Sequence, residues 1–205
     1  MKILYTPIQG LVHRVQIVCR ELDIEKNIEW IPTQPYESPQ HLLEQNPLSK
    51  VPTLVTDTGL SLFPGYLIYE YLDSIAGPKL YPTTASDRWA ALRLLSIGEG
   101  LWDTTVIWNN ERKRTDEKTS ESYLHRYMAA IQRILELLEK EAHTFNTFNI
   151  GHISIAGTLG FLEFAHQRDV DTNPFGSTIP NFRQNRPNLC HWYDNIRQRP
   201  SFREN

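Results

Sequence analysis

The chain has 205 residues, of which 40% are hydrophobic and 22% charged, so it is long and apolar enough for one large domain or two small ones, and disorder is excluded. Its formal net charge of -3 at pH 7 excludes the strongly basic surface typical of proteins that bind nucleic acid or anionic membranes. Cys19 and Cys190 are the two cysteines, and their wide separation excludes a disulfide framework.

The N-terminal residues do not have the pattern of a secretion signal. Pro7 interrupts the first apolar stretch, and no run of 18 apolar residues occurs anywhere in the sequence. We therefore expect a soluble, cytoplasmic protein with neither a membrane nor a nucleic acid as partner.

Strands and helices are expected to alternate in the first part of the chain. A short apolar run at 2–5 predicts a buried strand, and apolar residues at helical spacing over 11–22 predict a helix. A second strand is predicted at 28–31 and a short helix at 40–45. Because a helix separates the two strands, we expect parallel pairing with a right-handed crossover.

A hairpin and a third helix complete this part. A loop leads into a strand ending at Val55, the turn at 56–59 contains Gly59, and a strand follows at 60–62. A helix is predicted from Pro64 to the Gly77-Pro78 pair. Its apolar residues are expected on one buried face: Leu67, Ile68, Tyr71, Leu72 and Ile75. The order is therefore βαβ, a further helix, then ββα.

The rest of the sequence has only helical patterns. Residues 79–86 contain Pro82 and no periodicity, which predicts a linker between a first domain at 1–78 and a second at 87–205. Helices in the second domain are predicted at 87–113, 117–142 and 154–167, with a last one from Pro187 to before Arg199.

Several motifs resemble those of the glutathione transferase superfamily, most closely its bacterial and fungal branches. The most specific is Asn46–Leu54, and Tyr69–Leu72, Arg186–Leu189 and Arg199–Phe202 support it. The resemblance covers nearly the whole chain. It implies a thioredoxin-like α/β domain, an all-helical domain, a homodimer, and glutathione as co-substrate. It also implies a cis Val51–Pro52 bond that turns the N–H and C=O of Val51 toward glutathione.

The catalytic position implied by the resemblance carries an unusual residue. Family members hold the glutathione thiolate with a hydroxyl or thiol near the start of the first helix, where the helix dipole also lowers the thiol pKa. Gln9 takes this position here; its amide can donate a hydrogen bond but cannot act as a base. Thr6, His13 and Tyr5 are neighbouring candidates. Each also has a structural interpretation: a turn for Thr6, polar helix surface for His13 and strand core for Tyr5.

A second departure lies at the start of the third helix, where the family usually has an acidic residue followed by serine. Here Pro64 and Gly65 stand in these places. Each lost charge-assisted hydrogen bond costs about 1.5–3 kcal/mol, which weakens glutathione binding unless other groups compensate. The residues expected to contact glutathione are Lys50, Val51, Pro52, Pro64 and Gly65.

A third departure concerns the sixth helix of the family, which usually begins with serine or threonine and has aspartate three residues later. Ser154 is present, but Gly157 takes the place of the acid, so half of a capping box is missing. His152 and Thr158 are the candidate substitutes.

The resemblance also implies where a second substrate binds, between the first helix and the middle of the fourth. Trp102, Thr105 and Asn109 share one face of the predicted helix and offer a ring and two polar groups. Ile8 and Leu11, near the start of the first helix, complete the expected apolar contacts. The alternative for this face is core packing or a dimer contact.

No metal site is expected, because the seven histidines form no i, i+4 pair and have no cysteine at ligand spacing.

Three functions remain open from the sequence. The first is an enzyme that acts on a small hydrophobic electrophile, by glutathione transfer or by glutathione-assisted isomerisation or elimination. The second is an isomerase, cyclase or dehydratase of the same fold that does not use glutathione. The third is a non-catalytic binding module.

Overall fold

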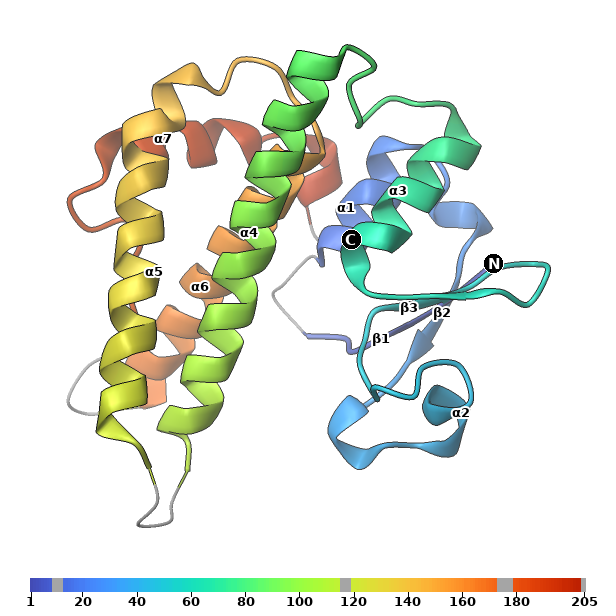
Figure 1. Ribbon diagram of the computed structural model, residues 1–205, viewed down its shortest axis with the longest axis horizontal. Helices are drawn as coiled ribbons and strands as arrows, with labels where there is room; N and C mark the ends of the chain where they lie inside the picture. The colour runs from blue at the N-terminus through green and yellow to red at the C-terminus, as the bar shows by residue number, and fades with distance from the viewer. Residues whose placement is uncertain (9–12, 115–118, 173–178, 204–205) are drawn as a thin grey trace. The chain divides into compact units, whose positions relative to one another are not determined.

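The structure is a computed structural model that describes residues 1–8, 13–114, 119–172 and 179–203 (Figure 1). The chain divides into two compact units, the first ending at Trp89 and the second beginning at Ala90. The first unit therefore takes in the segment 79–86.

A four-stranded sheet forms the centre of the first unit. Its strands are β1 (Lys2–Tyr5), β2 (Glu29–Pro32), β3 (Thr53–Val55) and β4 (Ser61–Leu62), in the order β2-β1-β3-β4. The β1–β2 pair is parallel, as predicted from the intervening helix, and the other two pairs are antiparallel. β2 begins and ends one residue later than predicted.

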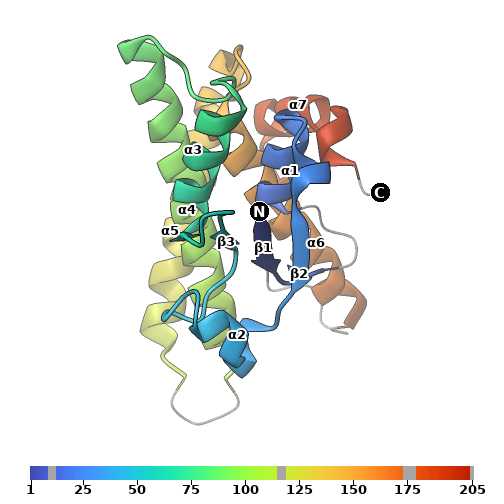
Figure 2. The same cartoon turned by 90° about the vertical axis from the view of Figure 1, so that its right-hand side faces the viewer.

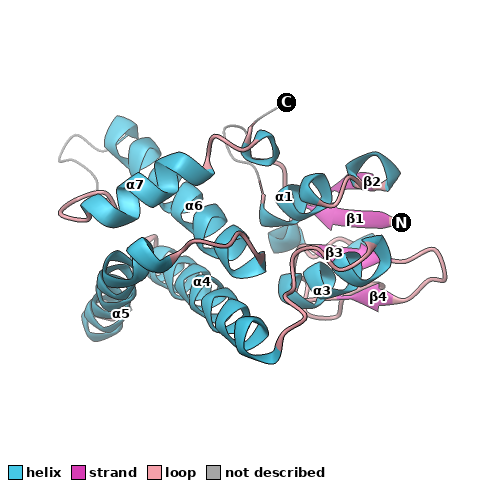
Figure 3. Cartoon of the chain, turned by 90° about the horizontal axis from the view of Figure 1, so that it is seen from above, coloured by secondary structure: helices cyan, strands magenta, loops and turns pink. Residues whose placement is uncertain are grey.

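Helices cover both faces of this sheet. α1 (Arg14–Glu21) and α3 (Gly65–Ala76) pack against each other on one face (Figures 1 and 3). The short α2 (Gln40–Leu43) lies on the other face (Figure 1). Short 3-10 turns occur at Glu25–Asn27 and Pro35–Glu37. The buried side of α1 carries Val15, Ile17, Val18 and Cys19, which are the residues of an amphipathic helix packed on a sheet.

The buried face of α3 differs from the predicted one. Leu67 and Ile75 are 39% and 49% exposed, whereas Tyr69 and Asp73 are buried. The reason is a polar contact that apolar spacing does not report. The Asp73 carboxylate accepts hydrogen bonds from the backbone N–H groups of residues 79–81, at 2.9, 2.8 and 3.3 Å, and these bonds hold the segment after α3 against the helix.

The second unit is helical. It contains most of α4 (Ala85–Arg112), α5 (Glu121–Glu141), α6 (Ile150–Thr172) and α7 (Pro187–Ile196), with 3-10 turns at Ala142–Thr144 and Pro200–Phe202 (Figures 1 and 2). Buried residues from all four helices form one core, among them Leu101, Leu135, Leu159 and Leu189. None of the described helices has the length and apolar character needed to cross a membrane. A thioredoxin-like α/β unit followed by a helical unit confirms the predicted fold class.

The start of α6 corrects a prediction. The helix begins at Ile150, and Asn149 precedes it: the Asn149 side chain accepts from the N–H of Gly151 at 3.0 Å, and the Asn149 N–H donates to Nδ1 of His152 at 3.2 Å. A reciprocal cap is therefore present before the predicted start. The prediction that this helix begins at Ser154 with an incomplete capping box, because Gly157 takes the place of the acid, is wrong.

Ser154 instead lies inside α6, where this helix crosses α4. Its hydroxyl donates to Oε1 of Glu99 at 2.9 Å. A Cβ at Gly98 would overlap this hydroxyl oxygen and lie 2.8 Å from the backbone N of Ile155, so only glycine permits the close approach of the two helices.

Candidate functional site

The loop between α2 and β3 is held by one buried amide. Asn46 is fully buried; its Nδ2 donates to the carbonyl of Lys50 at 2.9 Å and to Oγ1 of Thr53 at 3.0 Å, and its Oδ1 accepts from the N–H of Leu48 at 3.0 Å. Thr53 also donates to the Lys50 carbonyl, at 2.8 Å. The sequence motif pointed to this loop, but not to Asn46 and Thr53 as the side chains that shape it.

Val51 presents a backbone with unused hydrogen-bonding capacity. The Val51–Pro52 bond is cis, which confirms the prediction. Among the described residues, neither the N–H nor the C=O of Val51 has a hydrogen-bond partner. Backbone groups of this kind are usually paired, so a free N–H and C=O on one residue beside a strand can accept an extended peptide.

The start of α3 offers further donors. Pro64 is the N-cap residue, and its carbonyl accepts from the N–H groups of Leu67 and Ile68 at 3.1 and 3.3 Å. The N–H groups of Gly65 and Tyr66 have no partner within the described ranges, and the first turn contains no acidic residue. A helix start with free N–H groups and no nearby negative charge favours an anion.

Lys50 is the nearest cation in sequence to this backbone. Its side chain is exposed and forms no ion pair with the described residues. The side chain can therefore approach a carboxylate on a bound ligand, as predicted from the sequence. Because the lysine side chain is long and flexible, such a contact would not fix the orientation of the carboxylate.

His13 stands at the N-terminus of α1 and is largely enclosed. Burial lowers its pKa below the ordinary value; the hydrogen bond to the Thr6 backbone acts in the opposite direction and the Arg14 charge lowers it further. Its Nε2 is buried and has no partner in the part of the chain that the structure describes. The lowered pKa and the burial of Nε2 both disfavour the charged form of the His13 ring.

The remaining candidates of the first unit serve partly structural roles. The Thr6 hydroxyl donates to the carbonyl of Thr33 at 2.8 Å, which ties the residue after β1 to the residue after β2. Tyr5 packs edge-on against Trp30, with 5.3 Å between ring centroids. Ile8 is half-buried. Two predicted contacts, Gln9 and Leu11, lie outside the described residues.

The candidates in the second unit differ in their surroundings. The half-buried Trp102 packs its ring against Phe161, with 4.5 Å between centroids, and the Asn109 side chain accepts from Arg112 at 3.1 Å. Thr105 is only 1% exposed, and its hydroxyl donates to the carbonyl of Leu101 at 2.7 Å. The burial and internal hydrogen bond of Thr105 make it a packing residue of α4.

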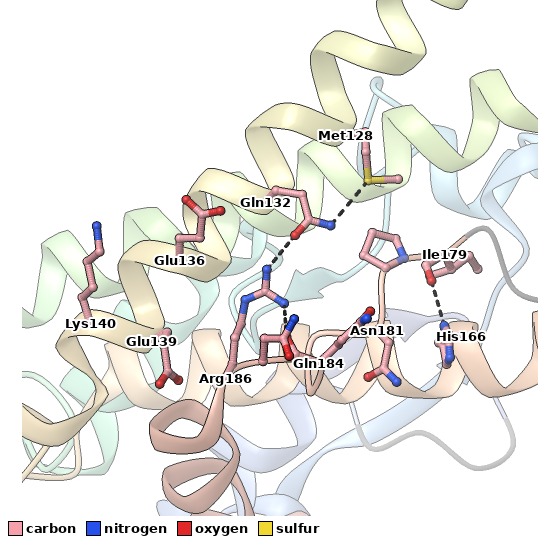
Figure 4. A pocket seen from close by; sticks show the side chains of 12 residues that line it. Met128, Gln132, Glu136, Glu139, Lys140, His166, Ile179, Asn181, Gln184 and Arg186 are labelled. Atoms are coloured by element: carbon pink, nitrogen blue, oxygen red, sulfur yellow. Dashed lines mark hydrogen bonds between the residues drawn. The ribbon is translucent and has the colours of Figure 1, made fainter.

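A cavity of about 660 Å³ lies between α5 and the segment 179–186 (Figure 4). Its polar groups mainly hold the start of α7: Arg186 donates to Gln132 at 2.6 Å, and Glu139 accepts from the N–H groups of Asn188 and Leu189 at 3.1 and 2.8 Å. No sequence motif predicted this cavity, because its walls come from segments far apart in the chain. Within the described residues, no cluster of three metal-binding side chains occurs.

Comparison with known proteins places this geometry in a family. A family model described as the glutathione S-transferase N-terminal domain matches residues 11–75. A crystal structure of a glutathione transferase family member from Pseudomonas fluorescens Pf-5, with bound glutathione, is 32% identical; the match covers 98% of this chain and 96% of the other, with a TM-score of 0.85. The chain belongs to the glutathione transferase superfamily.

Other relatives agree with this membership and confirm the resemblance found in the sequence. An uncharacterized GST-like protein of Escherichia coli K12, YibF, is 27% identical over 98% of this chain and 96% of its own length. The Pseudomonas fluorescens protein was also crystallised with S-(propanoic acid)-glutathione, and that structure matches with a TM-score of 0.80. A transferase from Methylobacillus flagellatus with glutathione bound, 22% identical and with a TM-score of 0.83, shares the fold.

Proposed function

We propose that this transferase-family protein binds glutathione in its first unit and uses the thiol on a small hydrophobic electrophile, by transfer or by assisted isomerisation or elimination. The observation that carries the proposal is the peptide unit of Val51, whose N–H and C=O both lack a partner among the described residues. Glutathione is a peptide, and its cysteinyl N–H and C=O can pair with these two groups as a short strand does.

The two ends of glutathione carry charges that the first unit can meet. We propose that the exposed ammonium of Lys50 meets the glycyl carboxylate and that the N–H groups of Gly65 and Tyr66 meet the γ-glutamyl carboxylate. Pro64 contributes neither an N–H nor a charge, so the ammonium end of the ligand loses the acidic partner that the family usually provides.

The thiol requires a group that stabilises or accepts its proton. We propose that Gln9 orients the sulfur by donating a hydrogen bond and that His13, which stands at the N-terminus of α1, accepts the thiol proton. The hydroxyl of Thr6 is a weaker candidate, because it already donates to Thr33.

The second substrate is expected to contact an aromatic surface. We propose that the ring of Trp102 is this surface and that Asn109 borders it. We further propose that the protein works in the cytoplasm, and that it does so as the homodimer that the family resemblance implies.

Isothermal titration calorimetry with millimolar glutathione tests the proposal, together with a thiol-transfer assay on an aryl halide. We expect saturable heat and a rate above background. Lys50→Ala should weaken binding about twofold to fivefold, because an exposed charge pair contributes modestly. Lys26→Ala, on the exposed turn at Glu25–Asn27, is the matched control. Absence of both heat and turnover would exclude glutathione chemistry.

A second candidate is an enzyme of the same fold that does not use glutathione. The Pro64-Gly65 pair favours this candidate, because these residues replace the acidic residue and the serine that family members usually have at the start of the third helix. The variants Gln9→Ser and Pro64→Asp test it. A gain in thiol transfer would indicate that only these groups had been lost from a glutathione site, whereas unchanged background activity would favour a remodelled site.

A further inference from the structure

We propose that Thr53 is a positioning residue for glutathione: its buried hydroxyl, together with the Asn46 amide, aims the N–H of Val51 at the cysteinyl carbonyl of the ligand. The inference rests on the proposed function, because it concerns one contact of the same ligand. Thr53 itself makes no contact with glutathione; it acts through the peptide unit that joins Lys50 to Val51.

The peptide unit between Lys50 and Val51 has a fixed orientation. Its bond is trans. In a planar trans peptide the C=O and the N–H point in opposite directions, so a fixed carbonyl also fixes the direction of the N–H. The Lys50 carbonyl is bound by Asn46 and Thr53, and the Val51 N–H therefore points away from these two buried side chains.

Two hydrogen bonds hold the Lys50 carbonyl. It accepts from the Thr53 hydroxyl at 2.8 Å and from Nδ2 of Asn46 at 2.9 Å, so both lone pairs of the oxygen are used. Nδ2 of Asn46 also donates to the Thr53 hydroxyl oxygen at 3.0 Å, which closes a triangle in which every proton has an acceptor. Rotation of the peptide plane would break both bonds to the carbonyl and leave buried donors unpaired.

Thr53 connects this triangle to the sheet. It is the first residue of β3 and is fully buried, and β3 pairs with β1 in the register that sets Thr53 opposite Leu4. Asn46, in contrast, belongs to the loop before β3. The hydroxyl of Thr53 is therefore a fixed point on a rigid element, against which the peptide plane of the loop is oriented.

The N–H of Val51 remains available to a ligand. It has no hydrogen-bond partner among the described residues, and Val51 is half-buried. A donor whose direction is set before binding loses little conformational freedom when the ligand arrives, and this raises affinity. We therefore expect the Thr53 hydroxyl to contribute to glutathione affinity from a position that the ligand does not reach.

Variants at Thr53 test this role. Thr53→Val removes the hydroxyl and keeps the branched shape of the side chain, and Thr53→Ala removes the hydroxyl with a smaller side chain. We expect both to weaken glutathione binding about fivefold in calorimetry, the typical effect of losing one neutral hydrogen bond. Thr53→Ser keeps the hydroxyl and should stay within about twofold of wild type.

Thr56→Val is the matched control. Thr56 is also buried, and its hydroxyl oxygen accepts from the N–H of Leu60 at 3.0 Å in the turn between β3 and β4. The substitution therefore removes a buried hydroxyl from the same unit without touching the loop before β3, and it should leave glutathione affinity unchanged.

Backbone amide signals in proton–nitrogen correlation spectra distinguish positioning from a purely structural role. At saturating glutathione the amide proton of Val51 should shift downfield in wild type, because it then donates a hydrogen bond, and this shift should be much smaller in Thr53→Val. The amide protons of Gly65 and Tyr66, which are proposed to bind the other end of the ligand, should shift equally in both proteins.

Unchanged affinity and an unchanged Val51 shift in Thr53→Val and Thr53→Ala would overturn the inference while the proposed function stands. Glutathione binding to wild type without a Val51 shift would also overturn it. An equal loss of affinity in Thr56→Val, or equally reduced shifts at Gly65 and Tyr66, would indicate a general loosening of the first unit and would overturn it too. A wild type that does not bind glutathione overturns both the inference and the proposed function.

Discussion

At the scale of single residues, two buried polar groups do most to define the candidate site. Asn46 shapes the loop before the cis proline through three side-chain hydrogen bonds. Burial lowers the pKa of His13. Neither role follows from residue type alone, since asparagine is common in loops and histidine is common on helix surfaces.

Replacing Asn46 by alanine should lower the free energy of unfolding by about 2–3 kcal/mol, because the carbonyl of Lys50 and the N–H of Leu48 lose a buried partner. Urea denaturation of the two proteins measures the difference. Asn27→Ala, at an exposed position, should change stability by less than about 0.5 kcal/mol. Equal effects of the two substitutions would contradict the role assigned to Asn46.

Replacing His13 by glutamine should lower thiol transfer about 100-fold if the imidazole accepts the thiol proton, while glutathione affinity changes little. When initial rates are measured from pH 5 to 8, the variant should also lack the part of the pH dependence that His13 contributes in the wild type. The exposed His125→Gln is the control. Unchanged rates in His13→Gln would leave Gln9 as the candidate for the thiol.

At the scale of elements, the ends of helices α3 and α6 depart most from the predictions. Asp73 binds the N–H groups that follow α3, and this buries a charged residue that lies outside the face expected to be buried. Asn149 and His152 cap α6 before the residue from which it was predicted to begin. In both cases a polar side chain binds backbone groups that helical periodicity does not include.

The cap of α6 should make stability depend on pH. Burial of the ring lowers the pKa of His152 from 6.5 to about 4. Between pH 6.5 and about 4 the unfolded chain binds a proton that the folded chain does not, so stability falls as the pH falls through this window, by up to about 3 kcal/mol.

Urea denaturation at several pH values measures this dependence. His152→Gln keeps an acceptor for the Asn149 N–H but cannot titrate, so its profile should be flatter; His13 contributes in the same direction and accounts for part of what remains. The exposed His143→Gln should leave the profile unchanged. A His152→Gln profile as steep as that of wild type would contradict this account.

At the scale of the whole molecule, each unit has its own core, and the glutathione contacts proposed here lie in the first. The first core consists of the sheet with α1 and α3, and the second joins residues of α4, α5, α6 and α7. Glutathione binding to the first unit should therefore raise the stability of the protein while the packing of the second core stays the same.

Glutathione at about 100 times its Kd should stabilise the protein by about 2.7 kcal/mol and raise the Tm, because a ligand that binds only the folded state shifts the unfolding equilibrium. Thermal denaturation at increasing glutathione concentration measures the shift. The dipeptide Cys-Gly, which lacks the γ-glutamyl group, should give a smaller shift at equal concentration. Equal shifts would argue against recognition at the start of α3.

The sequence by itself determined the fold class, the family and the loop with the cis Val51–Pro52 bond. The fold class follows from local patterns: apolar spacing at a period of two or 3.6 residues, and glycine and proline at turns. The family and the cis bond came from the resemblance of the Asn46–Leu54 motif to the glutathione transferases. The predicted roles of Gln9 and Leu11 stay predictions, because these residues lie outside the described ranges.

Only the tertiary structure decided which polar side chains are buried and what they bind. The hydrogen bonds of Asn46 and Thr53, the burial of Asp73 and Thr105, and the true start of α6 all depend on distances between atoms in packed elements. Periodicity reports which side of a helix is apolar, but a buried polar group is stable wherever a partner lies within reach, and that is a property of the folded chain.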